Sequence, residues 1–204
     1  FLVNVRRPEL PDGASVKLKP REKTSEAWAW DRRLTLEFSG ESPKLVSLRV
    51  EKAQLPTLFI AGDSTSTDQP QEPYNSWGQM ITAFLRLEIV VANNGESGET
   101  ADSFRSENRW RKLMSQLKRG DTVLIQFGHN DQKDKRPGAG AFTTYKDSLR
   151  AFAHDVQDKG ATPVLITPVQ RRTFDEGGHV TNSLGDFPEA VRQLAAEERL
   201  ALID

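Results

Sequence analysis

The chain contains no cysteine, so it cannot form a disulfide, a thiolate nucleophile or a cysteine-ligated metal site. It also has little net charge, because 28 lysine and arginine residues oppose 29 aspartate and glutamate residues for a formal net charge of −1. This balance argues against a protein that binds nucleic acid or another polyanion through bulk electrostatics. No run approaches the roughly 18 consecutive apolar residues of a membrane-spanning helix, so we expect no membrane insertion.

The chain has 204 residues, which suffices for one ordinary domain and a smaller additional unit. It begins with Phe1 rather than with methionine, and no signal peptide is visible. Both ends fall within segments of strand-like composition, residues 1–5 and 201–204. We therefore expect the sequence to be a piece of a longer protein.

Residues 1–54 lack helical periodicity and are predicted to form a β-rich segment. Apolar and polar residues alternate, or nearly so, in four stretches: residues 1–5, 15–19, 34–38 and 45–50. Trp28 and Trp30 also alternate, which favours packing on the neighbouring domain over a platform for sugar stacking. We interpret this segment as the end of a β-sandwich domain.

From residue 57 the pattern changes to alternating strands and helices, so residues 57–204 are predicted to form a second domain. Strands are predicted at residues 57–62, 88–92, 122–127, 163–167 and 200–203, of which the first two are expected to be buried. Amphipathic helices are predicted at residues 77–87, 104–117 and 142–156, followed by a last helix with a capping box from Asp186 to Glu189. The alternation predicts an α/β fold with a parallel sheet covered on both faces.

The first three predicted strands end in distinctive loops. These loops are residues 62–65 (GDST), residues 93–100 (NNGESGET) and residues 128–131 (GHND). If the strand order is the common 2-1-3-4-5, the first strand lies between the other two, and the loops meet at the sheet edge where such folds bind ligands.

Together these loops could carry out acyl transfer. Ser64 offers a hydroxyl nucleophile on a turn, and Gly98 offers a backbone N–H that a substrate can approach closely. With the Ser64 N–H and the Asn130 amide, they would form an oxyanion hole of the kind that ester cleavage requires. A Gly-Asp-Ser sequence alone is also typical of an ordinary polar loop after a strand.

The three loops resemble three of the four sequence blocks of the GDSL/SGNH hydrolases. Finer detail resembles the rhamnogalacturonan acetylesterase branch of the carbohydrate esterases: WG at residues 77–78, NNGESG at 93–98, FGHND at 127–131 and TPVQRR at 167–172. The resemblance implies a flavodoxin-like three-layer α/β/α sandwich and a secreted or periplasmic esterase that needs no cofactor. Its implied substrates are O-acetyl groups on pectic polysaccharide.

The resemblance also assigns roles to individual residues. Ser64 is the implied nucleophile, and Ser64, Gly98 and Asn130 are the implied oxyanion donors. The residues expected to contact the substrate are Asp63, Thr65, His129 and Arg171.

The fourth block of the family, an Asp-x-x-His pair after the fifth strand, is missing from these 204 residues. Because a serine nucleophile needs an adjacent base, we expect the catalytic Asp and His beyond Asp204, with the domain truncated before that block. The alternative is a non-catalytic relative. His129 is interpreted as a site-lining residue rather than the base, His154 as structural or solvated, and His179 as a surface residue.

Four functional hypotheses follow. The first is a serine esterase that deacetylates plant cell-wall polysaccharide through an acetyl-enzyme. The second is another esterase of the superfamily, with a lipid or thioester substrate, although Arg171 and Arg172 better suit a polar, anionic sugar chain. The third is a non-catalytic carbohydrate-binding module that uses Trp28 and Trp30. A flavodoxin-like phosphate binder is disfavoured because the first loop has few glycines and carries Asp63.

Overall fold

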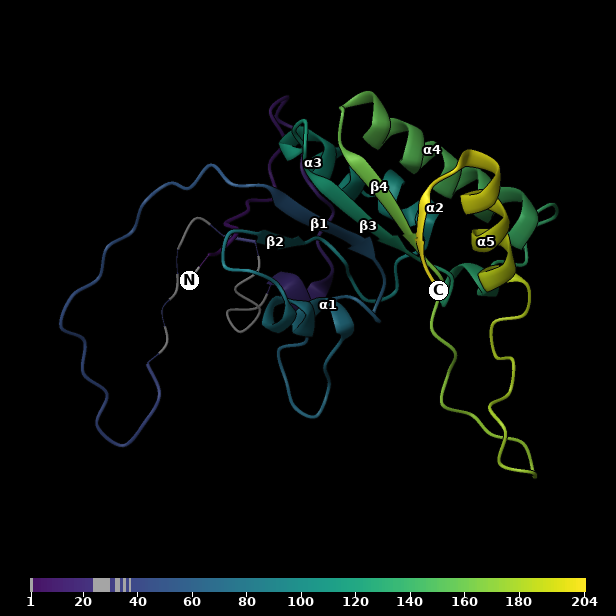
Figure 1. Ribbon diagram of the computed structural model, residues 1–204, viewed down its shortest axis with the longest axis horizontal. Helices are drawn as coiled ribbons and strands as arrows, with labels where there is room; N and C mark the ends of the chain where they lie inside the picture. The colour runs from purple at the N-terminus through teal and green to yellow at the C-terminus, as the bar shows by residue number, and fades with distance from the viewer. Residues whose placement is uncertain (1, 24–29, 32–33, 35, 37) are drawn as a thin grey trace.

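The computed structural model describes residues 2–23, 30–31, 34, 36 and 38–204. Its centre is a five-stranded sheet with the strand order β2-β1-β3-β4-β5 (Figure 1), in which every neighbouring pair is parallel. The strands are β1 (Thr57–Gly62), β2 (Val90–Asn93), β3 (Thr122–Gln126), β4 (Thr162–Ile166) and β5 (Ala201–Ile203). This order confirms the predicted α/β fold of the flavodoxin-like type.

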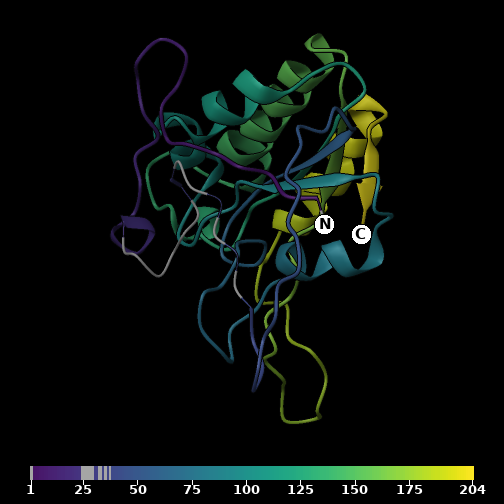
Figure 2. The same cartoon turned by 90° about the vertical axis from the view of Figure 1, so that its left-hand side faces the viewer.

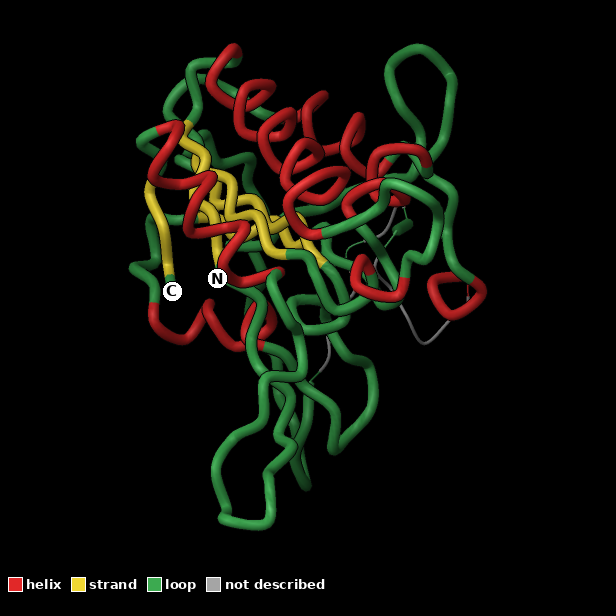
Figure 3. The backbone as a smooth tube through the Cα atoms, turned by 90° about the vertical axis from the view of Figure 1, so that its right-hand side faces the viewer, coloured by secondary structure: helices red, strands yellow, loops and turns green. Residues whose placement is uncertain are grey.

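Helices cover both faces of the sheet, as Figures 1 and 3 show. One face carries α2 (Ala101–Ser106), α3 (Arg109–Gln116), α4 (Lys146–Asp158) and α5 (Phe187–Glu198). The other face carries α1 (Trp77–Met80) and the 3₁₀ turn η2 (Ile81–Phe84). The main core lies under the first group, where the Phe152 ring contacts those of Phe104, Trp110 and Phe127 at centroid distances of 4.1–6.4 Å.

Three helix predictions differ from the structure. The predicted helix at 77–87 is the short helix α1 followed by the 3₁₀ turn η2, which ends at Phe84. The predicted helix at 104–117 is two helices, because Asn108 adopts a left-handed conformation (φ 65°) between α2 and α3. The predicted capping box at Asp186 is not formed, since Asp186 is the N-cap of α5 but has helical backbone angles and makes no side-chain cap bond. A capping box does form at α2, between Thr100 and Ser103.

Among the described residues, no strand forms at residues 1–5, 15–19 or 45–50, where the sequence predicted strands. Trp28 and part of residues 34–38 lie outside the described residues. In residues 15–19 the backbone bonds elsewhere, since the Lys17 N–H donates to the Glu107 carbonyl at 3.0 Å. Residues 38–56 extend away from the sheet as a long arm (Figures 1 and 2) in which Val46 is 99% exposed. The proposed β-sandwich origin of this segment stays a prediction.

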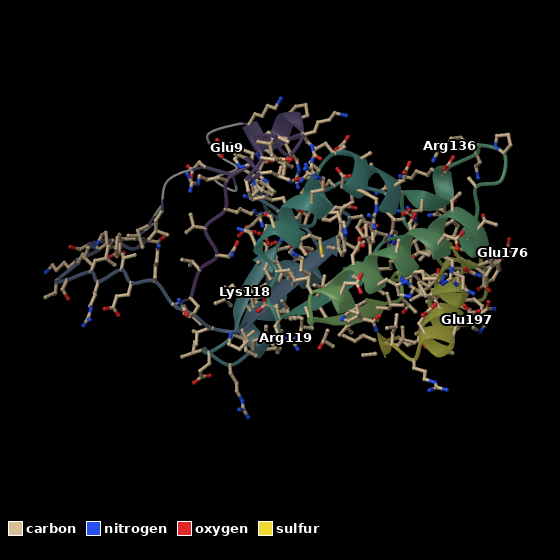
Figure 4. All side chains as sticks on the ribbon, turned by 90° about the horizontal axis from the view of Figure 1, so that it is seen from above. Glu9, Lys118, Arg119, Arg136, Glu176 and Glu197 are labelled. Atoms are coloured by element: carbon tan, nitrogen blue, oxygen red, sulfur yellow. The ribbon has the colours of Figure 1, made fainter. Side chains whose placement is uncertain are left out.

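Residues 8–23 pack against the α/β domain beside α3, and we call them the N-terminal segment. The Lys112 side chain of α3 donates to the Glu9 carbonyl at 2.8 Å. Figure 4 labels Glu9 in this segment. Leu10 and Val16 form a small core with Trp30, whose indole N–H donates to Glu22 at 2.7 Å. Trp30 is therefore buried in a cluster of the N-terminal residues, whereas the sequence predicted packing on the neighbouring domain. None of the helices in the described residues has the length and apolar composition needed to cross a bilayer.

Candidate active site

Strand β1 ends in a tight turn that carries Ser64. The Ser66 and Thr67 N–H groups both donate to the Asp63 carbonyl at 3.1 Å, which closes the turn. Gly62 is required before it, because a Cβ there would lie 2.7 Å from the Gln126 carbonyl and would also contact the Ser66 hydroxyl. The glycine thus lets the turn pack directly against β3.

The Asp63 side chain supports this turn from inside. It is fully buried, and its Oδ1 accepts the Thr65 N–H at 2.9 Å and lies 2.9 Å from the Thr65 hydroxyl. Its Oδ2 lies 3.6 Å from Nδ1 of His129. Asp63 therefore shapes the site, where the sequence predicted a substrate contact, because its carboxylate points into the protein rather than into solvent.

The backbone N–H groups of Ser64 and Gly98 have no acceptor within the described part of the chain. The Ser64 hydroxyl likewise has no hydrogen-bond partner among those residues, and Ser64 is half-buried. Gly98 is exposed with φ +82°, and a Cβ there would meet nothing within 4 Å. The left-handed backbone, rather than crowding by the protein, accounts for glycine at this position.

The loop after β2 is held against the Ser64 turn by Asn93. The Asn93 side-chain NH₂ donates to the Ser66 carbonyl at 2.6 Å, and its Oδ1 accepts the Gly95 N–H at 3.1 Å. The Glu96 N–H also donates to the Gly62 carbonyl at 3.1 Å. These bonds bring the first two predicted loops together.

The loop after β3 joins them through Asn130 and Asp131. The Asn130 NH₂ donates to the Glu99 carbonyl at 3.0 Å, which leaves its second N–H without an acceptor among the described residues. The Asp131 carboxylate accepts the N–H groups of Gly128 and Ala101, both at 2.9 Å. Burial raises the pKa of Asp131 to about 6, and the charge of Asp63 adds to this shift.

His129 and Arg171 also meet at this edge of the sheet. His129 is 5% exposed, and its carbonyl lies 3.4 Å from the guanidinium of exposed Arg171. The other two histidines lie elsewhere, since His154 pairs with Glu198 at 3.1 Å and His179 lies 3.4 Å from Asp175. No imidazole of the described residues bonds to the Ser64 hydroxyl.

Sequence reasoning missed Gln126, which links three strand ends. Its Oε1 lies 2.7 Å from the Thr65 hydroxyl and accepts the Trp77 indole N–H at 2.6 Å, while its NH₂ donates to the Thr167 carbonyl at 2.9 Å. The available signal was one amide in the otherwise apolar run at 123–127. Among the described residues, no group of three or more His, Asp and Glu side chains could hold a metal ion.

A half-buried serine after β1, backbone N–H groups without an acceptor among the described residues and an asparagine amide on a joined loop are the groups that a serine hydrolase on an α/β fold requires. The chain belongs to the GDSL-like Lipase/Acylhydrolase family, whose model matches residues 60–204.

Three Bacillus subtilis proteins illustrate the similarity. The chain is 40% identical to rhamnogalacturonan acetylesterase RhgT over 149 residues, which is 72% of this chain and 63% of that protein. It is 35% identical to the probable rhamnogalacturonan acetylesterase YesY, over 72% of this chain and 69% of that protein. A crystal structure of YxiM superposes with a TM-score of 0.66 at 29% identity, over 74% of this chain and 44% of YxiM. The chain thus spans less than two thirds of RhgT and less than half of YxiM.

Proposed function

We propose that the protein carrying this chain is a serine esterase that removes O-acetyl groups from pectic polysaccharide of the rhamnogalacturonan type. The observation that carries the proposal is that hydrogen bonds join the loops of Ser64, Gly98 and Asn130. The Glu96 N–H donates to the Gly62 carbonyl, and the Asn130 NH₂ donates to the Glu99 carbonyl. The similarity to RhgT and YesY supports the choice of an acetylated polysaccharide over a lipid or thioester.

In the proposed reaction, the Ser64 hydroxyl oxygen attacks the acetyl carbonyl carbon while its proton passes to a base. The carbonyl oxygen becomes an oxyanion that the N–H groups of Ser64, Gly98 and Asn130 stabilise. The tetrahedral intermediate then expels the sugar oxygen, which takes a proton from the base and leaves an acetyl-enzyme. Water hydrolyses this ester to acetate and restores Ser64.

The base in this proposal is the histidine of the family's Asp-x-x-His block, which these 204 residues do not contain. His129 is a poor candidate because its Nδ1 faces Asp63 Oδ2 at 3.6 Å and no bond joins it to Ser64 within the described chain. We assign His129, Thr65 and Arg171 to the rim of the substrate site. Exposed Arg171 suits the uronic acid carboxylates of a pectic chain.

We further propose that the protein is secreted or periplasmic, because a polysaccharide substrate of this size lies outside the cytoplasmic membrane. Cell fractionation with an antibody to the protein checks this. Recovery of the protein only in the cytoplasm would contradict it.

The test of the proposed function is acetate release from acetylated rhamnogalacturonan pectin by the full-length protein. Ser64→Ala should lower kcat by about 10⁴-fold or more, because the acetyl-enzyme cannot form. Ser115→Ala, which removes a serine hydroxyl from α3 away from the site, is the matched control and should keep full activity. Full activity of Ser64→Ala, or a preference for long-chain esters or thioesters over acetylated pectin, would contradict the proposal.

A further inference from the structure

We propose that Glu99 is a positioning residue for the oxyanion donors, and that Lys19 of the N-terminal segment holds Glu99 in place. The inference rests on the proposed function and deepens it. It concerns a contact between parts of the chain that are 80 residues apart, and neither the family blocks nor the strand-end loops include Lys19.

Glu99 lies between two of the expected donors. It directly follows Gly98 in the chain, and its carbonyl accepts the Asn130 NH₂ at 3.0 Å. An amide NH₂ has two N–H donors, so this bond fixes the direction of the second one. Lys133 holds the other end of the Asn130 amide, with its ammonium 2.8 Å from Oδ1. The orientation of the Asn130 amide therefore depends on where the Glu99 backbone lies.

The Glu99 side chain is completely buried and held by charge. Its Oε1 lies 2.8 Å from the Lys19 ammonium and 3.2 Å from Arg109 Nε, and its Oε2 accepts the Ser103 hydroxyl at 2.5 Å. Because a buried carboxylate needs such partners, loss of one of them favours movement of Glu99 toward water. Movement of the side chain would displace the adjoining Gly98 N–H and the carbonyl that holds Asn130.

The N-terminal segment supplies part of this support. Lys19 contacts both Glu99 and Glu107, at 2.8 and 3.0 Å, and is 27% exposed. Glu22 of the same segment pairs with Arg109, the other cation beside Glu99. The segment thus contributes one cation to Glu99 directly and fixes the second through Glu22.

Lys17 offers a matched control within the same segment. Its ammonium contacts Glu107 at 2.8 Å, as that of Lys19 does at 3.0 Å, but the Lys17 side chain is 75% exposed and has no contact with Glu99. A comparison of Lys19→Met with Lys17→Met therefore removes one lysine each time from the same segment and the same Glu107. Only the first substitution removes a cation that contacts Glu99.

The assay uses the full-length protein with p-nitrophenyl acetate as the substrate. We expect Lys19→Met to lower kcat about tenfold and Glu99→Gln to lower it about 10- to 100-fold, which is less than the effect of removing an oxyanion donor. KM should change by no more than about twofold. Lys17→Met should keep the kcat of the parent. A second readout is the side-chain amide signal of Asn130 in protein labelled with [¹⁵N]asparagine, assigned with Asn130→Ala. This signal should shift in Lys19→Met and Glu99→Gln but not in Lys17→Met.

Equal kcat values for Lys19→Met and Lys17→Met, together with an unchanged Asn130 signal in Glu99→Gln, would overturn the inference. If the parent protein does not cleave acetyl esters at all, the proposed function fails, and the amide signals alone still decide whether Glu99 and Lys19 position Asn130. Equal losses of stability in the two variants without the split in kcat would assign Lys19 a structural role only.

Discussion

At the scale of single residues, Asp131 combines a structural task with an unfavourable charge. Its carboxylate joins the loop after β3 to the start of α2 through the N–H groups of Gly128 and Ala101. Burial, with a further contribution from Asp63, raises its pKa from 3.8 to about 6. Because the folded state then binds this proton more tightly than the unfolded chain, Asp131 contributes stability that is complete below about pH 4 and is lost as the pH rises through about 6.

Asp131→Asn should remove this pH dependence. Two pKa units correspond to about 3 kcal/mol, so the free energy of unfolding of the parent should fall about 2–3 kcal/mol further between pH 4 and pH 7 than that of the variant. Urea unfolding at pH 4, 5.5 and 7 measures the difference. Asp134→Asn is the control, because hydrogen bonds from Arg136 hold the pKa of Asp134 below its usual value. Parallel stability curves for Asp131→Asn and the parent would contradict the assigned cause.

Gly98→Ala separates the cost of backbone strain from the loss of a donor. Gly98 (φ +82°) and Gly120 (φ +87°) share a left-handed backbone, and a Cβ at either meets nothing within 4 Å. Both alanine variants should therefore lose about 1–2 kcal/mol of stability, as measured by urea unfolding. Only Gly98→Ala should also lower the kcat for acetyl esters, because strain at residue 98 shifts the N–H group of that residue, which is a proposed oxyanion donor. Equal activity of the two variants would count against Gly98 as an oxyanion donor.

At the scale of elements, the sequence predicts the sheet well and the helix ends poorly. Apolar runs such as residues 123–125 are buried on both faces of a parallel sheet, so composition alone identifies them. The break between α2 and α3 could not be predicted, because the apolar positions of residues 104–117 stay in helical phase. It depends on Asn108, whose side chain donates to the Ser15 carbonyl at 3.0 Å, a contact between segments 93 residues apart.

In the candidate site too, some features could be predicted from the sequence and others could not. Ser64, Gly98 and Asn130 could be proposed from the sequence because each lies in a loop after a strand, and parallel strands bring their carboxyl ends to one edge. The burial of Asp63 could not be predicted, since a carboxylate in a loop is ordinarily solvated. The roles of Gln126 and Glu99 could not be predicted either, because both act through contacts with other loops rather than through a local sequence pattern.

At the scale of the whole molecule, the N-terminal segment is joined to the α/β domain through buried charge. Arg109 of α3 has a fully buried side chain whose guanidinium donates to Glu22 at 3.0 and 2.5 Å. Burial alone would raise the pKa of Glu22, but the hydrogen bonds and charge of Arg109 outweigh burial and hold it below the usual value. Glu22 therefore stays ionised at neutral pH, as a partner of Arg109 must.

Glu22→Gln should therefore weaken the whole molecule, because it leaves the Arg109 charge buried with one carboxylate, Glu99, instead of two. Loss of one member of a buried pair costs about 3–5 kcal/mol, whereas an exposed pair contributes little. Asp12→Asn, which breaks the exposed pair between Asp12 and Arg111, is the matched control on the same segment and should leave stability unchanged. Urea unfolding at pH 7 compares the two variants. Equal stability of both would mean that the N-terminal segment is held by the apolar cluster of Leu10, Val16 and Trp30 rather than by the buried ion pair.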